Sequence, residues 1–247
     1  MHLRSGGRAL DAPRSVSVEP GYLKNVPGSA LYRLGDTWVL ATASIEDDVP
    51  RFLRESKEGW LTAEYGMMPA STRPRSPRTP VNPRGLGRLI EIQRMIGRSL
   101  RSVVDLSNLG NNTIFLDCEV LQADGGTRTA SVNASYIALK LLVSHCMKIG
   151  ILQRNPVRDE IGAISVGIVQ DRIMVDLDYG EDSIAQVDMS IVMTGKKRIV
   201  EIQGNAEGKP FDVEMLDTMV QESWKGLERI FQVARDVLKN GDYDIKL

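Results

Sequence analysis

At 247 residues the chain is long enough to bury a substantial core, and its 42% hydrophobic and 26% charged residues are ordinary for a soluble globular protein. A net charge of −1 excludes a globally basic nucleic-acid-binding protein, so any nucleic-acid partner must be held by a local basic patch. Two histidines and two cysteines leave too few parts for Ser-His-Asp or Cys-His catalysis, a multi-histidine metal site or a disulfide framework.

The same composition bears on where the protein works. No apolar run approaches the roughly 20 residues that a membrane span needs, and the N-terminus lacks the apolar core of a signal peptide. Cys118 and Cys146 lie in an apolar strand and an apolar helix, so we expect both to be buried, inert thiols. These features predict a cytoplasmic protein with no membrane partner.

The first third of the chain reads as strands followed by a long loop. Residues 14–19 and 29–44 alternate as half-buried strands do, with Gly35-Asp36 as a hairpin turn, and 59–62 predicts another short strand. From Pro69 to Arg88, five prolines and five arginines predict an irregular, exposed loop. A solvated loop is possible, but uncompensated arginines gathered in one loop more often mark an anionic partner.

Helical periodicity begins at Arg88 and runs to Val104, which places Arg88 in a first helical turn where phosphate could bind. Strand 113–122, a Gly125-Gly126 turn and a helix to about Lys148 follow. Strands are then predicted at 163–169, 172–178, 189–194 and 198–203, with a final helix at 212–238. Strands then helices, twice over, predict an α+β protein with two similar β-then-α halves, roughly 1–150 and 151–247.

The stretch from Asp117 to Ser131 is the most informative local pattern. Two glycines let the backbone turn sharply and approach a ligand without an intervening side chain. Thr127, Arg128 and Thr129 would then offer a hydroxyl, a guanidinium and unpaired N–H groups at a helix start. Such a helix start is a natural anion site, most often for phosphate. The alternative is a plain turn with a threonine N-cap and a solvated Arg128.

A run of carboxylates follows in the second half. Five acidic side chains within thirteen residues would repel one another unless they are solvated or neutralised by protons or a cation. Composition alone supports a solvated acidic loop and a divalent-metal or acid/base site equally well. The five residues are Asp176, Asp178, Glu181, Asp182 and Asp188.

Five ordered segments together resemble the ribonuclease PH family of phosphate-dependent 3′ exoribonucleases, in its bacterial single-domain form, over almost the whole chain. The resemblance implies one domain over residues 1–247, with a duplicated βα core of ribosomal-protein-S5-domain-2-like topology, assembled as a homohexameric ring of three dimers. The segments are Leu61–Met67, Gly87-Arg88 with Glu91–Arg101, Leu121–Ser131, Glu181-Asp182 with Asp188-Met189, and Val200–Gly204.

The resemblance also implies an activity: a tRNA nucleotidyltransferase that trims tRNA precursors beyond the CCA end, releases nucleoside diphosphates reversibly and also processes ribosomal RNA. Inorganic phosphate would be the nucleophile, and paired aspartates would perform acid/base chemistry or hold Mg²⁺. The matching positions are Arg88, Gly126, Thr127 and Arg128 for phosphate, Asp182 and Asp188 for catalysis and metal, and Arg75 and Arg78 for RNA.

Three departures from the family pattern concern RNA binding. Gly6 stands where an aspartate is usual within Arg4–Arg8, and Ala70 stands where an arginine is common. Pro77–Pro83 replaces a more helical, charged stretch. These departures leave RNA affinity and loop geometry open without affecting the phosphate site.

Two other functions fit parts of the sequence. A non-catalytic RNA-binding ring subunit would tend to lack the phosphate-site arginine or the paired aspartates, whereas Arg88, Arg128, Asp182 and Asp188 are all present. A kinase would need a different phosphate-binding loop, and no Gly-x-x-x-x-Gly-Lys-Ser/Thr motif occurs. The sequence therefore favours the phosphate-dependent nuclease.

Overall fold

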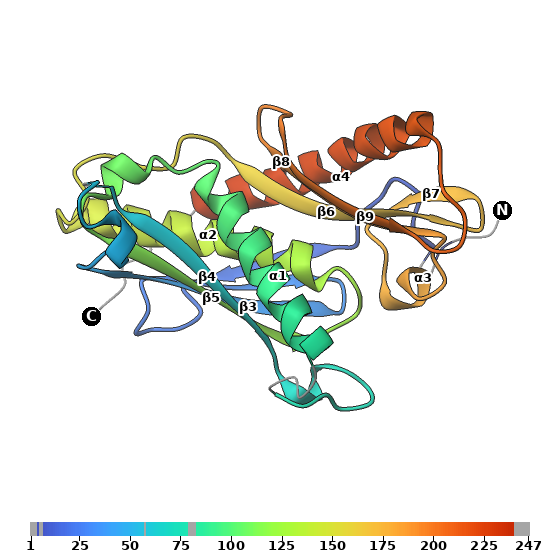
Figure 1. The fold of residues 1–247 in the computed structure, drawn as a ribbon, viewed down its shortest axis with the longest axis horizontal. Coiled ribbons are helices and arrows are strands. Elements are labelled where there is room, and N and C mark those ends of the chain that lie inside the picture. The colour runs from blue at the N-terminus through green and yellow to red at the C-terminus, as the bar shows by residue number, and fades with distance from the viewer. Residues whose placement is uncertain (1–3, 5–6, 57, 79–82, 240–247) are drawn as a thin grey trace.

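The computed structural model describes residue 4 and residues 7–56, 58–78 and 83–239. Gly6 and residues 79–82 of the proline-rich segment lie outside this range. The chain builds two sheets with helices between and outside them, so the predicted α+β class is confirmed (Figure 1).

The first sheet is mixed, because its edge strand β4 runs parallel to β5 while every other pair is antiparallel. Side chains of β3 alternate between buried and partly exposed, as expected of a sheet with one face on the core. The Gly35-Asp36 hairpin and the strand at 113–122 are confirmed, whereas β4 extends well beyond the predicted 59–62. In spatial order the strands are β1 (Val16–Pro20), β2 (Gly28–Leu34), β3 (Thr37–Glu46), β5 (Thr113–Gln122) and β4 (Trp60–Met67).

The second sheet is antiparallel throughout. All nine residues of β6 are buried, because helices cover both faces of the sheet. A two-residue turn at Gln170-Asp171 joins β6 to β7 as predicted. Both residues have positive φ, of 50° and 57°, which gives the turn a backbone twist that matches that of the two flanking strands. In spatial order the strands are β7 (Arg172–Val175), β6 (Ile161–Val169), β8 (Val187–Thr194) and β9 (Ile199–Ala206).

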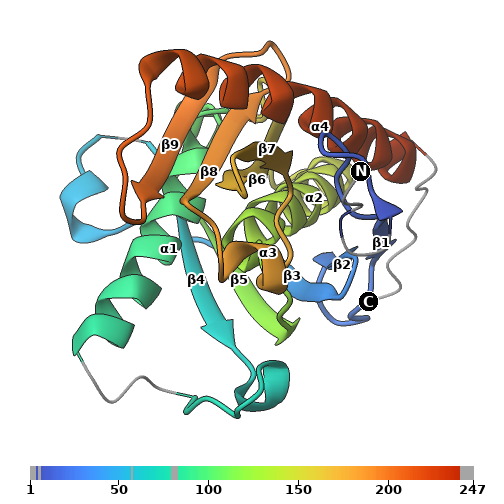
Figure 2. The same ribbon diagram turned by 90° about the vertical axis from the view of Figure 1, so that its right-hand side faces the viewer.

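The helix α2 (Thr127–Lys148) lies between the two sheets (Figure 2). It contacts β2 and β3 of the first sheet and β6 of the second, so the helix has buried residues on all of its sides. The longer α4 (Val213–Lys239) covers the outer face of the second sheet, and α1 (Pro83–Arg101) packs on β4 and α2.

The structure differs from the local predictions in three places. The strand predicted at 172–178 ends at Val175. α1 begins at Pro83 rather than at Arg88, so Arg88 lies in the second turn. Proline is favoured at the first position of a helix, and Pro83 starts the helix instead of ending the loop. The short helix α3 (Tyr179–Asp182) was not predicted. It forms because Asp178 and Glu181 make a reciprocal capping box at its start.

The side chain of Asn133 joins α2 to the second sheet. β7 pairs with β6 only from Val166 onward, so the same edge of β6 has no strand partner at Ala163. Asn133, which is buried, fills that place: its amide oxygen accepts from the Ala163 N–H at 2.8 Å and its amide nitrogen donates to the Ala163 carbonyl at 2.9 Å. The helix thus completes the sheet through one amide.

Replacement of Asn133 by alanine should leave the buried N–H and carbonyl groups of Ala163 without hydrogen-bond partners. We expect the free energy of unfolding to fall by about 2 to 6 kcal/mol, since each of the two buried unsatisfied groups costs about 1 to 3 kcal/mol. Chemical denaturation at one protein concentration measures this, with Ser144→Ala, an exposed site on the same helix, as the control. Equal midpoints for the two variants would show that Asn133 contributes nothing.

Candidate active site

The Gly125-Gly126 turn lies between β5 and α2, and both glycines have left-handed φ values, of 73° and 67°. A Cβ at Gly125 would lie 2.7 Å from the Leu177 carbonyl oxygen. A Cβ at Gly126 would lie 3.1 Å from Arg14. Protein atoms therefore occupy the space beside both glycines on these sides of the turn. The turn is bare because it packs against the second half of the chain.

The start of α2 nevertheless has the features of an anion site. In the part of the chain that the structure describes, no side chain caps the helix at Gly126. The Ala130 N–H donates to the Gly126 carbonyl at 3.0 Å, so the three N–H groups before Ala130 have no partner within the helix. The alternative of a threonine N-cap is wrong, because Thr127 is the first helical residue and glycine occupies the cap.

A buried tyrosine orients Thr127. The Tyr65 hydroxyl, on β4, donates to the Thr127 hydroxyl at 3.1 Å. Burial raises the pKa of Tyr65, while the hydrogen bond and the positive charges of Arg88 and Arg128 oppose the rise. Both guanidinium groups are therefore close to this hydroxyl pair. Tyr65 is not among the site residues predicted from the sequence, although its position two residues after Ala63 in an alternating strand indicates that it points inward.

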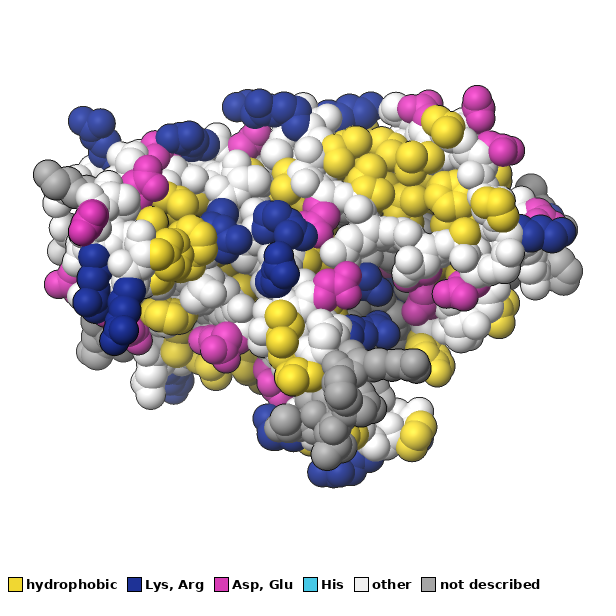
Figure 3. Space-filling view, in the orientation of Figure 1, with side chains coloured by type: hydrophobic (Ala, Val, Ile, Leu, Met, Phe, Trp, Pro, Cys, Tyr) yellow, Lys and Arg dark blue, Asp and Glu magenta, His cyan; other side chains and the backbone are white. Residues whose placement is uncertain are grey.

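The two predicted aspartates lie against these arginines. Arg128, whose side chain is only 24% exposed, lies 3.8 Å from the Asp188 carboxylate, so it is not simply solvated. Burial raises the pKa of Asp182, and the charge of Asp188 raises it further, whereas Arg128 and Arg88 lower it. Four elements, α1, α2, α3 and β8, thus bring two arginines and two aspartates into one cluster. In Figure 3, basic and acidic side chains meet in the middle of the face that carries α1.

The other carboxylates of the acidic run are neutralised by arginines near the N-terminus. Asp176, which is fully buried, binds Arg14 at 2.7 Å. Glu181 accepts two hydrogen bonds from Arg4, at 2.7 and 2.6 Å, and these lower its pKa against the opposing effect of burial. Neither a solvated acidic loop nor a metal cluster describes this run as a whole. Among the described residues, no group of three or more side chains that could hold a metal ion occurs.

The predicted RNA-binding arginines lie in the loop between β4 and α1. Arg78 has a 69% exposed side chain and lies 3.5 Å from Glu119 on β5, and Arg75 is exposed as well. Ala70 is exposed in the single turn Pro69–Ser71 that precedes them. The loop thus presents its arginines to solvent, as a surface for an extended anionic partner requires.

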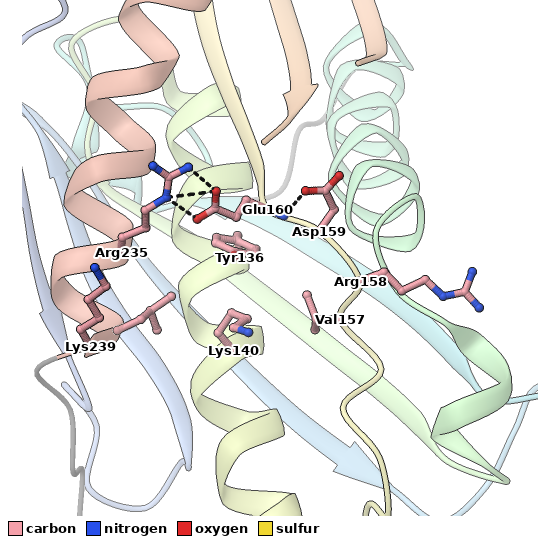
Figure 4. Close-up of a pocket in the computed structure, with 9 residues that line it drawn as sticks. Tyr136, Lys140, Val157, Arg158, Asp159, Glu160, Arg235 and Lys239 are labelled. Atoms are coloured by element: carbon pink, nitrogen blue, oxygen red, sulfur yellow. Dashed lines mark hydrogen bonds and ion pairs between the residues drawn. The ribbon is translucent and has the colours of Figure 1, made fainter. Parts of the chain in front are cut away.

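A separate cavity of about 500 Å³ lies between α2, α4 and residues 157–160 (Figure 4). There Arg235 holds Glu160 through hydrogen bonds of 2.9 and 3.1 Å, beside Tyr136. None of the predicted site residues lines this cavity. This cavity is therefore separate from the charged cluster at the start of α2, which is the candidate active site.

Comparison with known proteins identifies the family of the chain. Residues 12–143 match the model of the 3′ exoribonuclease family, domain 1, and residues 159–225 match domain 2. The chain belongs to the 3′ exoribonuclease family. The family resemblance stated from the sequence is confirmed.

Individual relatives cover nearly the whole chain. It is 48% identical to ribonuclease PH of Moorella thermoacetica over 96% of this chain and 94% of the relative. It is 46% identical to ribonuclease PH of Neisseria meningitidis over 94% and 96%. An Archaeoglobus fulgidus exosome structure with RNA bound to the active site matches with a TM-score of 0.75, 25% identity and coverage of 97% and 92%. The predicted fold and the prediction of an exoribonuclease are confirmed. No helix among the described residues is long and apolar enough to cross a membrane.

Besides burial, the charge of Asp188 should contribute to the raised pKa of Asp182. In the Asp188→Asn variant the like-charge repulsion is gone and Arg128 loses its partner, so we expect the pKa of Asp182 to fall toward its ordinary value. A carbon-13 NMR titration of aspartate-labelled protein in the presence of a chelator measures this. The signal of Asp182 is assigned with the Asp182→Asn variant. An unchanged midpoint would mean that the two carboxylates do not interact.

Proposed function

We propose that the chain catalyses phosphorolysis of RNA 3′ ends at this cluster, with Arg88, Gly126, Thr127 and Arg128 binding inorganic phosphate and Asp182 and Asp188 acting as the catalytic pair. The enzyme is a phosphate-dependent 3′–5′ exoribonuclease that trims tRNA precursors beyond the CCA end. The observation that carries the site assignment is the 3.8 Å contact between Arg128 and Asp188 at an uncapped helix start.

The start of α2 supplies what a phosphate nucleophile needs. The free N–H groups and the Thr127 hydroxyl orient its oxygens, and Arg88 and Arg128 neutralise its charge as it loses water. One phosphate oxygen attacks the phosphorus of the last phosphodiester, and the bond from that phosphorus to the 3′ oxygen breaks. The products are a nucleoside diphosphate and an RNA shortened by one nucleotide, so the bond energy is largely retained and the reaction runs in both directions.

The aspartates act on the departing 3′ oxygen. The raised pKa of Asp182 favours its protonated form, which can donate a proton as negative charge builds on that oxygen. The same pair of carboxylates fits Mg²⁺, which proteins commonly hold with one or two carboxylates together with substrate phosphates. When bound, the ion would supply Lewis-acid stabilisation of the same charge.

RNA beyond the reacting bond is held by the exposed loop. Arg75 and Arg78 contact RNA phosphates there. Ala70 stands where an arginine is common, so one further contact to RNA is missing. Several such loops meet in a homohexameric ring of three dimers, in which each chain is a single domain of two halves. Ribosomal RNA 3′ ends are a second substrate, and the enzyme works in the cytoplasm.

Arg128→Ala should abolish phosphorolysis, because removal of a positioned charged donor costs about 10² to 10³ in kcat. The assay uses a tRNA precursor with a short 3′ tail and Mg²⁺, with and without phosphate, and identifies the released mononucleotide. Arg229→Ala, an exposed arginine on α4, is the control, and gel filtration tests assembly. Wild-type turnover by Arg128→Ala at saturating phosphate would refute the assignment. Monophosphates released by the wild type without phosphate would instead indicate a hydrolase.

Replacement of both Arg75 and Arg78 by alanine should weaken RNA binding and flatten its salt dependence. Each lost phosphate contact is expected to reduce the slope of log K against log salt by about 0.7 to 0.9. Filter binding at several salt concentrations measures the slope. The double variant Arg172→Ala with Arg229→Ala removes the same charge from exposed sites elsewhere. Equal slopes for the two double variants would mean that the loop does not contact RNA.

A further inference from the structure

The Gly125-Gly126 turn and residues 176–179 belong to different halves of the chain, yet they pack backbone against backbone. A Cβ at Gly125 would lie 2.7 Å from both the Leu177 oxygen and the Asp178 carbonyl carbon, which leaves no room for any side chain. Thr127 follows the turn directly, and Asp182 ends the short helix α3, which begins at Tyr179. This contact therefore fixes the position of the aspartate relative to the phosphate-binding start of α2.

One guanidinium spans the contact. Arg14, 8% exposed, donates to the Asp124 carbonyl and, at 3.3 Å, to the Gly125 carbonyl, both in the turn. It also donates to the two carboxylate oxygens of Asp176, at 2.9 and 2.7 Å, and to the Leu177 carbonyl at 3.3 Å. A planar fork of donors is needed to reach both segments at once.

Asp176 accepts hydrogen bonds from the Arg14 guanidinium with both carboxylate oxygens. It is fully buried with φ of 57°, a strained value for a residue with a side chain, and it also accepts the backbone N–H of Arg14 at 2.7 Å. A lysine at position 14 would keep a positive charge for Asp176 but has only one nitrogen, so it could not bind the turn and the acidic segment together. Charge and geometry are thus separable at this position.

We propose that Arg14 is a positioning residue for phosphorolysis: it sets Asp182 against the phosphate-binding start of α2 by clamping the turn to residues 176–179. This inference rests on the proposed function. The donors of Arg14 are used within the protein, so it acts through the turn and Asp176 rather than on the substrate. A misplacement of about 1 Å between reacting groups can cost about 10²-fold in rate.

The test is Arg14→Lys in the full chain, assayed for nucleoside diphosphate release from the tailed tRNA precursor. We expect kcat to fall about 10- to 100-fold at saturating phosphate, while the dissociation constant for phosphate, from equilibrium dialysis, stays at the wild-type value. Asn133→Ala is the matched control, because it should weaken the contact between the two halves of the chain at a different place. The folded fraction of this variant should keep the wild-type kcat. Failure of the wild type to release diphosphates would refute the proposed function instead.

Two results would overturn the inference. A folded Arg14→Lys variant with wild-type kcat would show that the clamp does not position Asp182. Loss of phosphate binding in parallel with kcat would place Arg14 in the phosphate site itself. If Arg14→Lys does not fold, the pair Arg14→Gln with Asp176→Asn removes both buried charges and keeps hydrogen-bonding side chains. The same split between kcat and phosphate affinity is expected for this pair.

Discussion

Burial of α2 between the two sheets is the constraint on which the rest of the molecule depends. The helix contacts both sheets, so neither half of the chain can complete its core without it. Its sides are occupied by apolar packing, and Asn133 even replaces a missing strand partner for Ala163. Only the ends of such a helix remain open to a ligand, and its N-terminal end carries the partial positive charge that suits phosphate.

The negative charges of the acidic run, residues 176–188, must be neutralised for these residues to be buried near that helix end. Removing the partner of a buried ion pair costs roughly 3 to 5 kcal/mol, because an uncompensated charge is left inside the protein. Arg4 and Arg14 provide this compensation for Glu181 and Asp176 from a segment at the opposite end of the sequence. The N-terminal segment is therefore part of the core of the site, although it contributes no element of the sheets until β1.

Local patterns were enough to predict much of this fold. Alternation predicted the β2–β3 hairpin, apolar spacing predicted α4, and the Gly125-Gly126 pair predicted the turn before α2. The start of α1 was misplaced, because proline is common both in loops and at the first position of a helix, and only tertiary context decides between them. α3 was missed because four residues carry no periodicity.

The site was predicted less completely than the fold. Residue types and family resemblance gave the arginines and aspartates, but composition could not separate solvated carboxylates from buried ones. That decision depends on Arg4 and Arg14, which lie more than a hundred residues away in sequence. Tyr65 was likewise invisible as a partner of Thr127, because the contact joins β4 to α2 across the first half of the chain.

The division of labour among the five carboxylates gives the site its electrostatic character. Asp176 and Glu181 are saturated by guanidinium groups, and Asp178 is used to cap α3, so these three charges are fixed by the fold. Asp182 lies among the charges of Asp188, Arg88 and Arg128, and burial together with the charge of Asp188 raises its pKa. The paired carboxylates suit a cation, and the arginines beside them suit a phosphate. The same cluster therefore suits both ends of a phosphoryl transfer, with the nucleophile on the helix side and the leaving oxygen on the carboxylate side.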